Sequence, residues 1–214
     1  MENLKFALYL LVALVPSLVL HEFGHATAAD RLGDPSPRRW GRLTLSPRRL
    51  IDPFGSIVLP ALILVLVASG QGCLLPIFAY AKPMPLDPTY LGNRQRDSLL
   101  VILAGLGANL AIGAVAGVLL RLGPTGEVGL FVYAWLVVNV YMFVFQLMPV
   151  PGLDGSKLLA RVLPPRPREV YANLDHYLAL FILVFFFLLA GPLLSIVRAL
   201  ADPLFRLLAG VTFC

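Results

Sequence analysis

The sequence predicts an all-α, multi-pass membrane protein with about five to six transmembrane helices and a re-entrant or hairpin element after the first. Apolar residues make up 58% of the 214 and charged residues only 14%. A typical soluble domain has about 45–50% apolar and about 25% charged residues. The apolar residues also form runs long enough to cross a hydrocarbon core of about 30 Å as helices.

Four apolar runs define the main expected spans, at about 4–29, 98–120, 128–148 and 174–197. Residues 54–80 are also apolar, but Pro60, Gly70 and Pro76 interrupt them, and we therefore expect one short span and a returning piece. A short helix is expected at 156–162, and the tail at 198–214 is either amphipathic or a partial span. The whole of 1–214 is expected to form one membrane-embedded domain, with a core at 4–163 and C-terminal helices at 170–214.

Most of the 17 Lys and Arg residues lie in three connecting segments, 30–53, 82–97 and 150–170. The positive-inside rule places all three on the cytoplasmic side of a bacterial cell membrane. The stretch 54–81 must then leave and return to the same face. Because topology accounts for the net charge of +5, the expected partner is the lipid bilayer and not a nucleic acid.

The first span contains the motif His21-Glu22-Phe23-Gly24-His25. Residues four apart lie on one face of a helix, so both imidazoles can reach one metal ion. Glu22 lies beside the first ligand, where it can act as general base on a zinc-activated water. Ionisable residues within a span are expensive and mark functional sites. The motif therefore predicts one catalytic Zn²⁺, although a set of two His and one carboxylate can also hold non-haem iron.

A catalytic zinc needs a third protein ligand and an open position. Asp154 follows the fourth main span and lies on the predicted side, but the order Asp-Gly-Ser before an apolar run is also ordinary N-cap chemistry. His176 is a lower-ranked candidate for the third ligand. Asn109 lies within a span among small residues, where it could donate to an oxyanion or form a structural interhelical hydrogen bond.

Five segments in order resemble the site-2 protease family of intramembrane zinc metalloproteases in its small bacterial form. They are HEFGHATAADRLGD from His21, GRLTLSPRRLIDPFGSIVLP from Gly41, AKPMPLDP from Ala81, AGLGAN ending at Asn109, and PVPGLDGSKLL from Pro149. The resemblance covers most of the chain, from about Leu8 to Leu163.

The resemblance implies that His21, His25 and Asp154 bind zinc, that Glu22 is the general base, and that Asn109 lies near the scissile bond. It implies transmembrane segments of other proteins as substrates, with the region 54–88 receiving an extended substrate strand. Two positions depart from the family pattern. Leu106 replaces the usual Pro after Ala-Gly, and Gln146 replaces the usual Asn before the Pro-rich turn. Both departures concern substrate positioning more than metal binding.

Two other functions are compatible with a polytopic protein that carries these residues. A non-catalytic relative would bind clients or metal without cleaving, but it has no chemical need for Glu22. A metal transporter would carry ionisable residues along several spans, whereas here they gather at one site.

Overall fold

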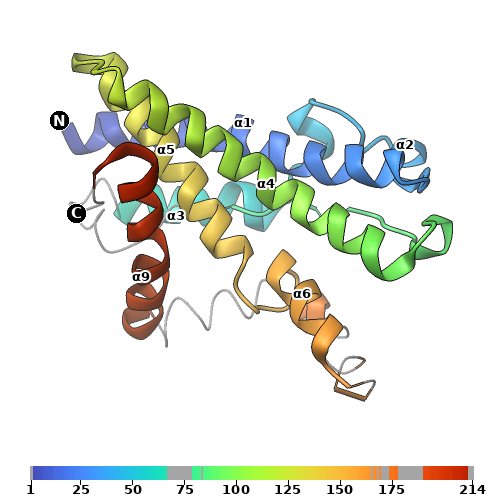
Figure 1. The fold of residues 1–214 in the computed structure, drawn as a ribbon. Helices are drawn as coiled ribbons and strands as arrows, with labels where there is room; N and C mark the ends of the chain where they lie inside the picture. The colour runs from blue at the N-terminus through green and yellow to red at the C-terminus, as the bar shows by residue number, and fades with distance from the viewer. Residues whose placement is uncertain are drawn as a thin grey trace.

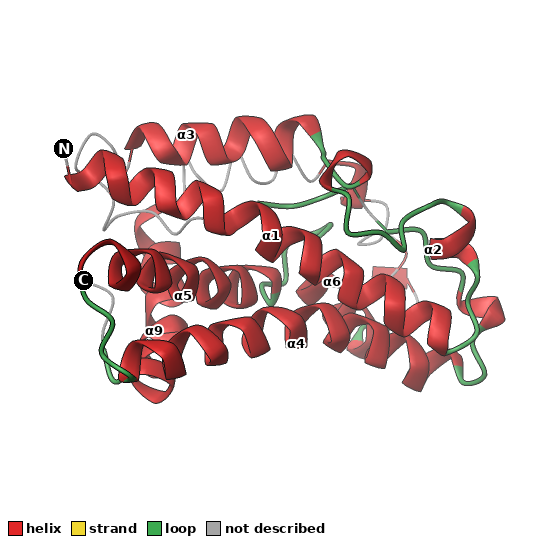
Figure 2. Cartoon of the chain, turned by 90° about the horizontal axis from the view of Figure 1, so that it is seen from above, coloured by secondary structure: helices red, strands yellow, loops and turns green. Residues whose placement is uncertain are grey.

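A computed structural model describes residues 2–66, 79–82, 84–164, 166–167, 169, 174–177 and 190–211, and these residues form helices and loops without strands (Figures 1 and 2). The longer helices are α1 (Glu2–Arg31), α4 (Arg94–Arg121), α5 (Gly126–Gln146) and α9 (Ala190–Ala209). The shorter ones are α2 (Ser36–Arg39), α3 (Leu59–Leu66) and α6 (Asp154–Val162). Single turns form at η1 (Pro47–Arg49), η2 (Pro53–Val58), η5 (Pro88–Tyr90) and η6 (Leu174–Tyr177).

Helices α1, α4 and α5 pack against one another and form the centre of the molecule, and α9 packs against α4 and α5 (Figure 1). Small and branched apolar side chains fill the interfaces, among them Ala13, Ala116 and Val138, which are fully buried. Large apolar side chains such as Val12 and Val118 remain exposed on the outside. Outward-facing apolar side chains are what a lipid environment favours, because lipid tails are as apolar as these residues.

In the part of the chain that the structure describes, three helices are long and apolar enough to cross a membrane, within Leu4–Arg31, Arg94–Arg121 and Gly126–Gln146. They match three of the four predicted main spans, which confirms an all-helical protein with several candidate membrane spans. The fourth predicted span, 174–197, falls largely outside the described residues.

Helix α9 includes residues on both sides of position 197, the expected end of the last span. The sequence predicts a span that ends at 197 and a tail that begins at Arg198, whereas the helix runs through this point and continues to Ala209. Its charged residues recur every four positions, at Arg198, Asp202 and Arg206, and therefore share one face. The adjoining face is buried through Val197, Ala201 and Phe205.

The segment after the basic loop is described on both sides of residues 67–78, and its two described parts are hydrogen-bonded to each other. Asp52 caps the turn η2 by accepting hydrogen bonds from the backbone N–H groups of Phe54 and Gly55, at 3.0 and 2.8 Å. Residues 67–78 lie outside the described residues. The chain at 79–82 is again beside 50–56, because Tyr80 N–H donates to Gly55 O at 3.3 Å and Lys82 N–H donates to Leu50 O at 3.0 Å. These bonds hold the stretch 79–82 against residues 50–56.

Candidate metal centre

The C-terminal half of α1 carries His21, Glu22 and His25, and α1 remains helical from Glu2 to Arg31 although Pro16 lies inside it. Both histidines are buried, with 1% and 4% of their surface exposed. Their rings meet edge to face, with centroids 4.6 Å apart. The two Nε2 atoms lie 3.1 Å apart. The spacing of four residues therefore directs both Nε2 atoms at one point, as the helical pattern predicts.

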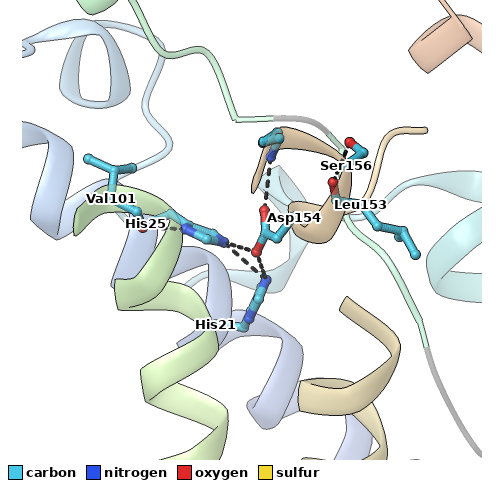
Figure 3. Close-up of polar contacts among 7 residues, drawn as sticks. His21, His25, Val101, Leu153, Asp154 and Ser156 are labelled. Carbon is cyan, nitrogen blue, oxygen red and sulfur yellow. Dashed lines mark hydrogen bonds and ion pairs between the residues drawn. The ribbon is translucent and has the colours of Figure 1, made fainter. Parts of the chain in front are cut away.

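Asp154 reaches the same point from α6 (Figure 3). Its Oδ2 atom lies 2.9 Å from His25 Nε2 and 3.4 Å from His21 Nε2. Ligand atoms at about 2.0–2.1 Å from a tetrahedral zinc are about 3.3 Å apart, so the three atoms fit three corners of such a site. Among the described residues, His21, His25 and Asp154 are the one group of three with metal-ligand geometry.

The hydrogen bonds around the cluster show that two of these atoms, His25 Nε2 and Asp154 Oδ2, present lone pairs to each other. His25 Nδ1 lies 2.8 Å from the carbonyl oxygen of Val101 on α4. That nitrogen therefore carries the proton and donates it, which leaves Nε2 as a lone pair facing the carboxylate. Asp154 Oδ2 is buried and accepts no hydrogen bond. Lone-pair atoms this close repel unless a cation lies between them, and the donor set consequently fits zinc.

The other carboxylate oxygen of Asp154, Oδ1, accepts a hydrogen bond from a lysine. Lys157 Nζ donates to Asp154 Oδ1 at 2.9 Å, which leaves Oδ2 for the metal. Lys157 was not singled out from the sequence, but its place three residues after Asp154 in an expected helix was the available signal. Val101 contributes only its backbone carbonyl. Every residue has this group, so the residue type at position 101 gives no signal in the sequence.

The start of α6 explains how Asp154 arrives at the site. Gly152 takes a left-handed conformation, with φ of 89°, in the turn before the helix. A Cβ atom on Gly155 would overlap the carbonyl oxygen of Leu147, so the helix start abuts the end of α5. Helix α6 begins at Asp154 itself, with Leu153 as N-cap and no side-chain cap. The capping alternative for Asp154 is wrong, because its carboxylate faces His25 and Lys157 instead.

Helix α4 lies against α1 at the level of the site. A Cβ atom on Gly105 would overlap the ring of His25, and one on Gly24 would be 2.8 Å from the carbonyl oxygen of Ala104. The small residues Gly24, Ala104 and Gly105 permit this close approach of the two backbones. Leu106, the first departure from the family pattern, is buried on α4.

A cavity opens beside the three ligand atoms. Its lining includes the half-buried Glu22, the extended stretch at Tyr80 and Ala81, and the side chains of Met84, Leu86 and Gln146. Gln146, the second departure from the family pattern, therefore faces the site. Asn109 is fully buried one helical turn beyond Gly105 and is not among the described lining residues. The side chain of His176 lies outside the described residues.

Comparisons with known proteins identify relatives over most of the chain. The "Putative zinc metalloprotease YwhC" of Bacillus subtilis is 31% identical over 188 residues, which cover 83% of this chain and 80% of YwhC. The "Putative zinc metalloprotease Rip2" of Mycobacterium tuberculosis is 35% identical over 175 residues, which cover 79% of this chain and 63% of Rip2. The Rip2 protein of Mycolicibacterium smegmatis is 34% identical over 185 residues, or 84% of this chain and 65% of that protein.

The chain thus spans less than two thirds of the Rip2 proteins but four fifths of YwhC. No protein-family model matches the chain. No solved structure matches it significantly. The relatives are named as zinc metalloproteases, and the buried cluster in this chain has the ligands that such a protein needs. The chain belongs to the site-2 protease family of membrane-embedded zinc metalloproteases.

Proposed function

We propose that this chain is an intramembrane endopeptidase that hydrolyses peptide bonds in transmembrane segments of other membrane proteins, with its active site toward the cytoplasmic side. The convergence of His21, His25 and Asp154 on one point is the observation that carries the proposal. Two of these residues lie on a helix long and apolar enough to cross a membrane. A buried set of ionisable residues on such a helix is expensive and needs a function.

His21, His25 and Asp154 are the residues that would hold zinc, in the His₂-carboxylate pattern of catalytic sites. Bound there, the metal supplies Lewis acidity, which lowers the pKa of a water molecule and polarises a peptide carbonyl. The Val101 carbonyl keeps His25 in the tautomer that ligation requires, and Lys157 orients the Asp154 carboxylate. Partners of this kind fix the direction of the ligand atoms.

Glu22 is the proposed general base. It follows His21 in α1, is half-buried, and lines the cavity with the ligands. Its carboxylate takes the proton of the attacking water and passes it to the leaving amine, which departs as the neutral amine of the new N-terminus. A group that accepts and returns a proton in this way must face the cavity, and Glu22 does.

Asn109 is proposed to donate to the developing oxyanion or to a substrate carbonyl. Neither its amide nitrogen nor its amide oxygen forms a hydrogen bond with a described residue, although both are buried. An unpaired buried amide is costly, which favours a partner that arrives with the substrate. Its position one turn from Gly105, the residue that contacts His25, supports this role.

The substrate is proposed to bind as an extended strand beside 79–87, and 54–81 is proposed as a re-entrant element. A helical segment must unwind to expose its carbonyls, and an extended partner can then satisfy its freed backbone groups. Tyr80, Ala81, Met84 and Leu86 support the idea, since they form one wall of the cavity without helical structure.

The test is metal analysis of the purified protein together with cleavage of a transmembrane model substrate, comparing wild type with Glu22→Gln. Gln is nearly isosteric with Glu but accepts no proton. We expect about one zinc per chain in both proteins and a loss of cleavage of at least about 10²-fold in the variant. Equal rates in the two proteins would remove Glu22 from the mechanism. Bound zinc with no cleavage in either protein would instead favour the non-catalytic relative.

A further inference from the structure

Asp34 is a fully buried carboxylate that lies beyond the end of α1, with none of its surface exposed. Both of its carboxylate oxygen atoms accept a hydrogen bond. Oδ1 accepts a hydrogen bond from the backbone N–H of Ser36 at 2.9 Å, and Oδ2 accepts one from the backbone N–H of Asp87 at 2.9 Å. Burial of a charge is tolerated when such donors satisfy it. The two donors belong to chain segments 51 residues apart, so Asp34 joins them.

The first of these bonds is a local turn, whereas the second is long-range. The bond to Ser36 closes the chain over two residues at the start of the short helix α2. The bond to Asp87 joins residues 53 apart in the sequence and adds nothing to α2. A purely local turn needs one of the two oxygens. The second oxygen therefore holds the segment around Asp87 to the end of α1.

That segment is a wall of the metal cavity. Asp87 directly follows Leu86, and Leu86 and Met84 line the cavity with His21 and Glu22. The contact continues beyond Asp87, because Gly33 has φ of 106° and a Cβ there would lie 3.1 Å from the carbonyl oxygen of Tyr90. The wall is thus attached to the turn that directly follows α1, nine residues beyond His25, and α1 carries two of the three proposed metal ligands.

We propose that Asp34 is a positioning residue for substrate binding: by holding Asp87 it fixes the distance between the 84–86 wall and the metal centre. The inference rests on the proposed peptidase function, because it is the substrate that the wall contacts. Loss of the bond frees the wall while His21, His25 and Asp154 stay in place. Binding of the substrate is then impaired more than the chemical step, and KM rises more than kcat falls.

The test compares Asp34→Asn and Asp34→Ala with Asp97→Asn. Asn keeps one acceptor and sets an NH₂ group against the other backbone donor, whereas Ala removes both acceptors. Asp97 is a matched control, since it is 8% exposed, accepts from the backbone N–H of Asn93 at 2.8 Å at the start of α4, and does not line the cavity. Each protein is measured for zinc content, for kcat and KM, and for hydrogen exchange of the amides of 84–90.

We expect both Asp34 variants to keep their zinc and to raise KM about tenfold or more, with kcat within about threefold of wild type. The Asp87 amide should exchange much faster in these variants, because its acceptor is gone. Asp97→Asn should leave both KM and this exchange unchanged. Unchanged KM and exchange in the Asp34 variants, an equal rise of KM in Asp97→Asn, or loss of zinc would each overturn the proposal. If the wild type shows no Glu22-dependent cleavage, the peptidase function fails, and the exchange measurement still decides whether Asp34 fixes the wall.

Discussion

Asn109 is the residue whose surroundings leave its role most open to experiment. The sequence offered two uses for it, an interhelical hydrogen bond or a donor to the substrate. In the structure its amide is buried on α4 and bonds to no described residue, so the first use finds no support there. A residue kept for stability would be expected to have its polar atoms paired.

Replacement of Asn109 by Ala should therefore slow catalysis without weakening the fold. Loss of one oxyanion donor reduces kcat by about 10²–10³-fold. Removal of an unpaired buried amide relieves its desolvation penalty, which offsets the cost of the small cavity that Ala leaves. Single-turnover cleavage, zinc content and thermal unfolding in detergent would be measured on the same preparation. A fall in melting temperature with cleavage at the normal rate would make Asn109 a structural residue.

The crossing of α1 and α4 is the element-scale feature on which the site depends. Gly105 lies directly against the ring of His25, and the Val101 carbonyl, one turn earlier, accepts from its Nδ1 atom. Helix α4 thus sets both the position and the tautomer of His25. The two helices can approach this closely because Gly24 on α1 and Gly105 on α4 have no side chain at the contact.

Gly105→Ala should consequently displace His25 and weaken zinc binding, by about tenfold or more in affinity. Gly107→Ala is a matched control on the same helix, because no atom lies within 4 Å of the position where its Cβ would be. The control should bind zinc as the wild type does and tolerate heat at least as well, since Ala favours helices over Gly. Zinc competition with a chromophoric chelator measures the affinities. Equal affinity in both variants would show that the crossing has room for a methyl group.

Much of this arrangement could be predicted from the sequence, for identifiable reasons. The pair His21 and His25 follows from helical periodicity alone, and the spans follow from apolar runs. Asp154 was ambiguous, because the same residue order suits a cap and a ligand, and its direction depends on how Gly155 packs against α5. Val101 acts through its backbone, and the second bond of Asp34 joins segments far apart in the chain. Contacts of these kinds leave no local pattern.

At the scale of the whole molecule, the helix bundle has two ends, and each end carries its own charged residues. Helices α1 and α4 run antiparallel, so the end of α1 and the start of α4 lie together near the Gly33–Tyr90 contact. The opposite end is marked by the ion pair of Lys5 with Glu127, 2.8 Å apart, which brings the start of α5 beside the start of α1. The start of the basic loop 30–53, next to Gly33, and the short turn at 122–126 therefore lie at opposite ends of the bundle.

This geometry predicts which loops face which side of the membrane. By the positive-inside rule the basic end, which is also the end nearer the metal centre, lies in the cytoplasm. Single cysteines would be placed at the exposed positions Ser46 and Thr125, in a chain with Cys73 and Cys214 changed to Ser. A membrane-impermeant maleimide added to intact cells should label Thr125→Cys and spare Ser46→Cys until the cells are opened. Labelling of position 46 alone would invert the orientation and place the site toward the outer face. Labelling of both positions in intact cells would show that the two ends do not lie on opposite sides of the membrane, and the bundle would then not span it.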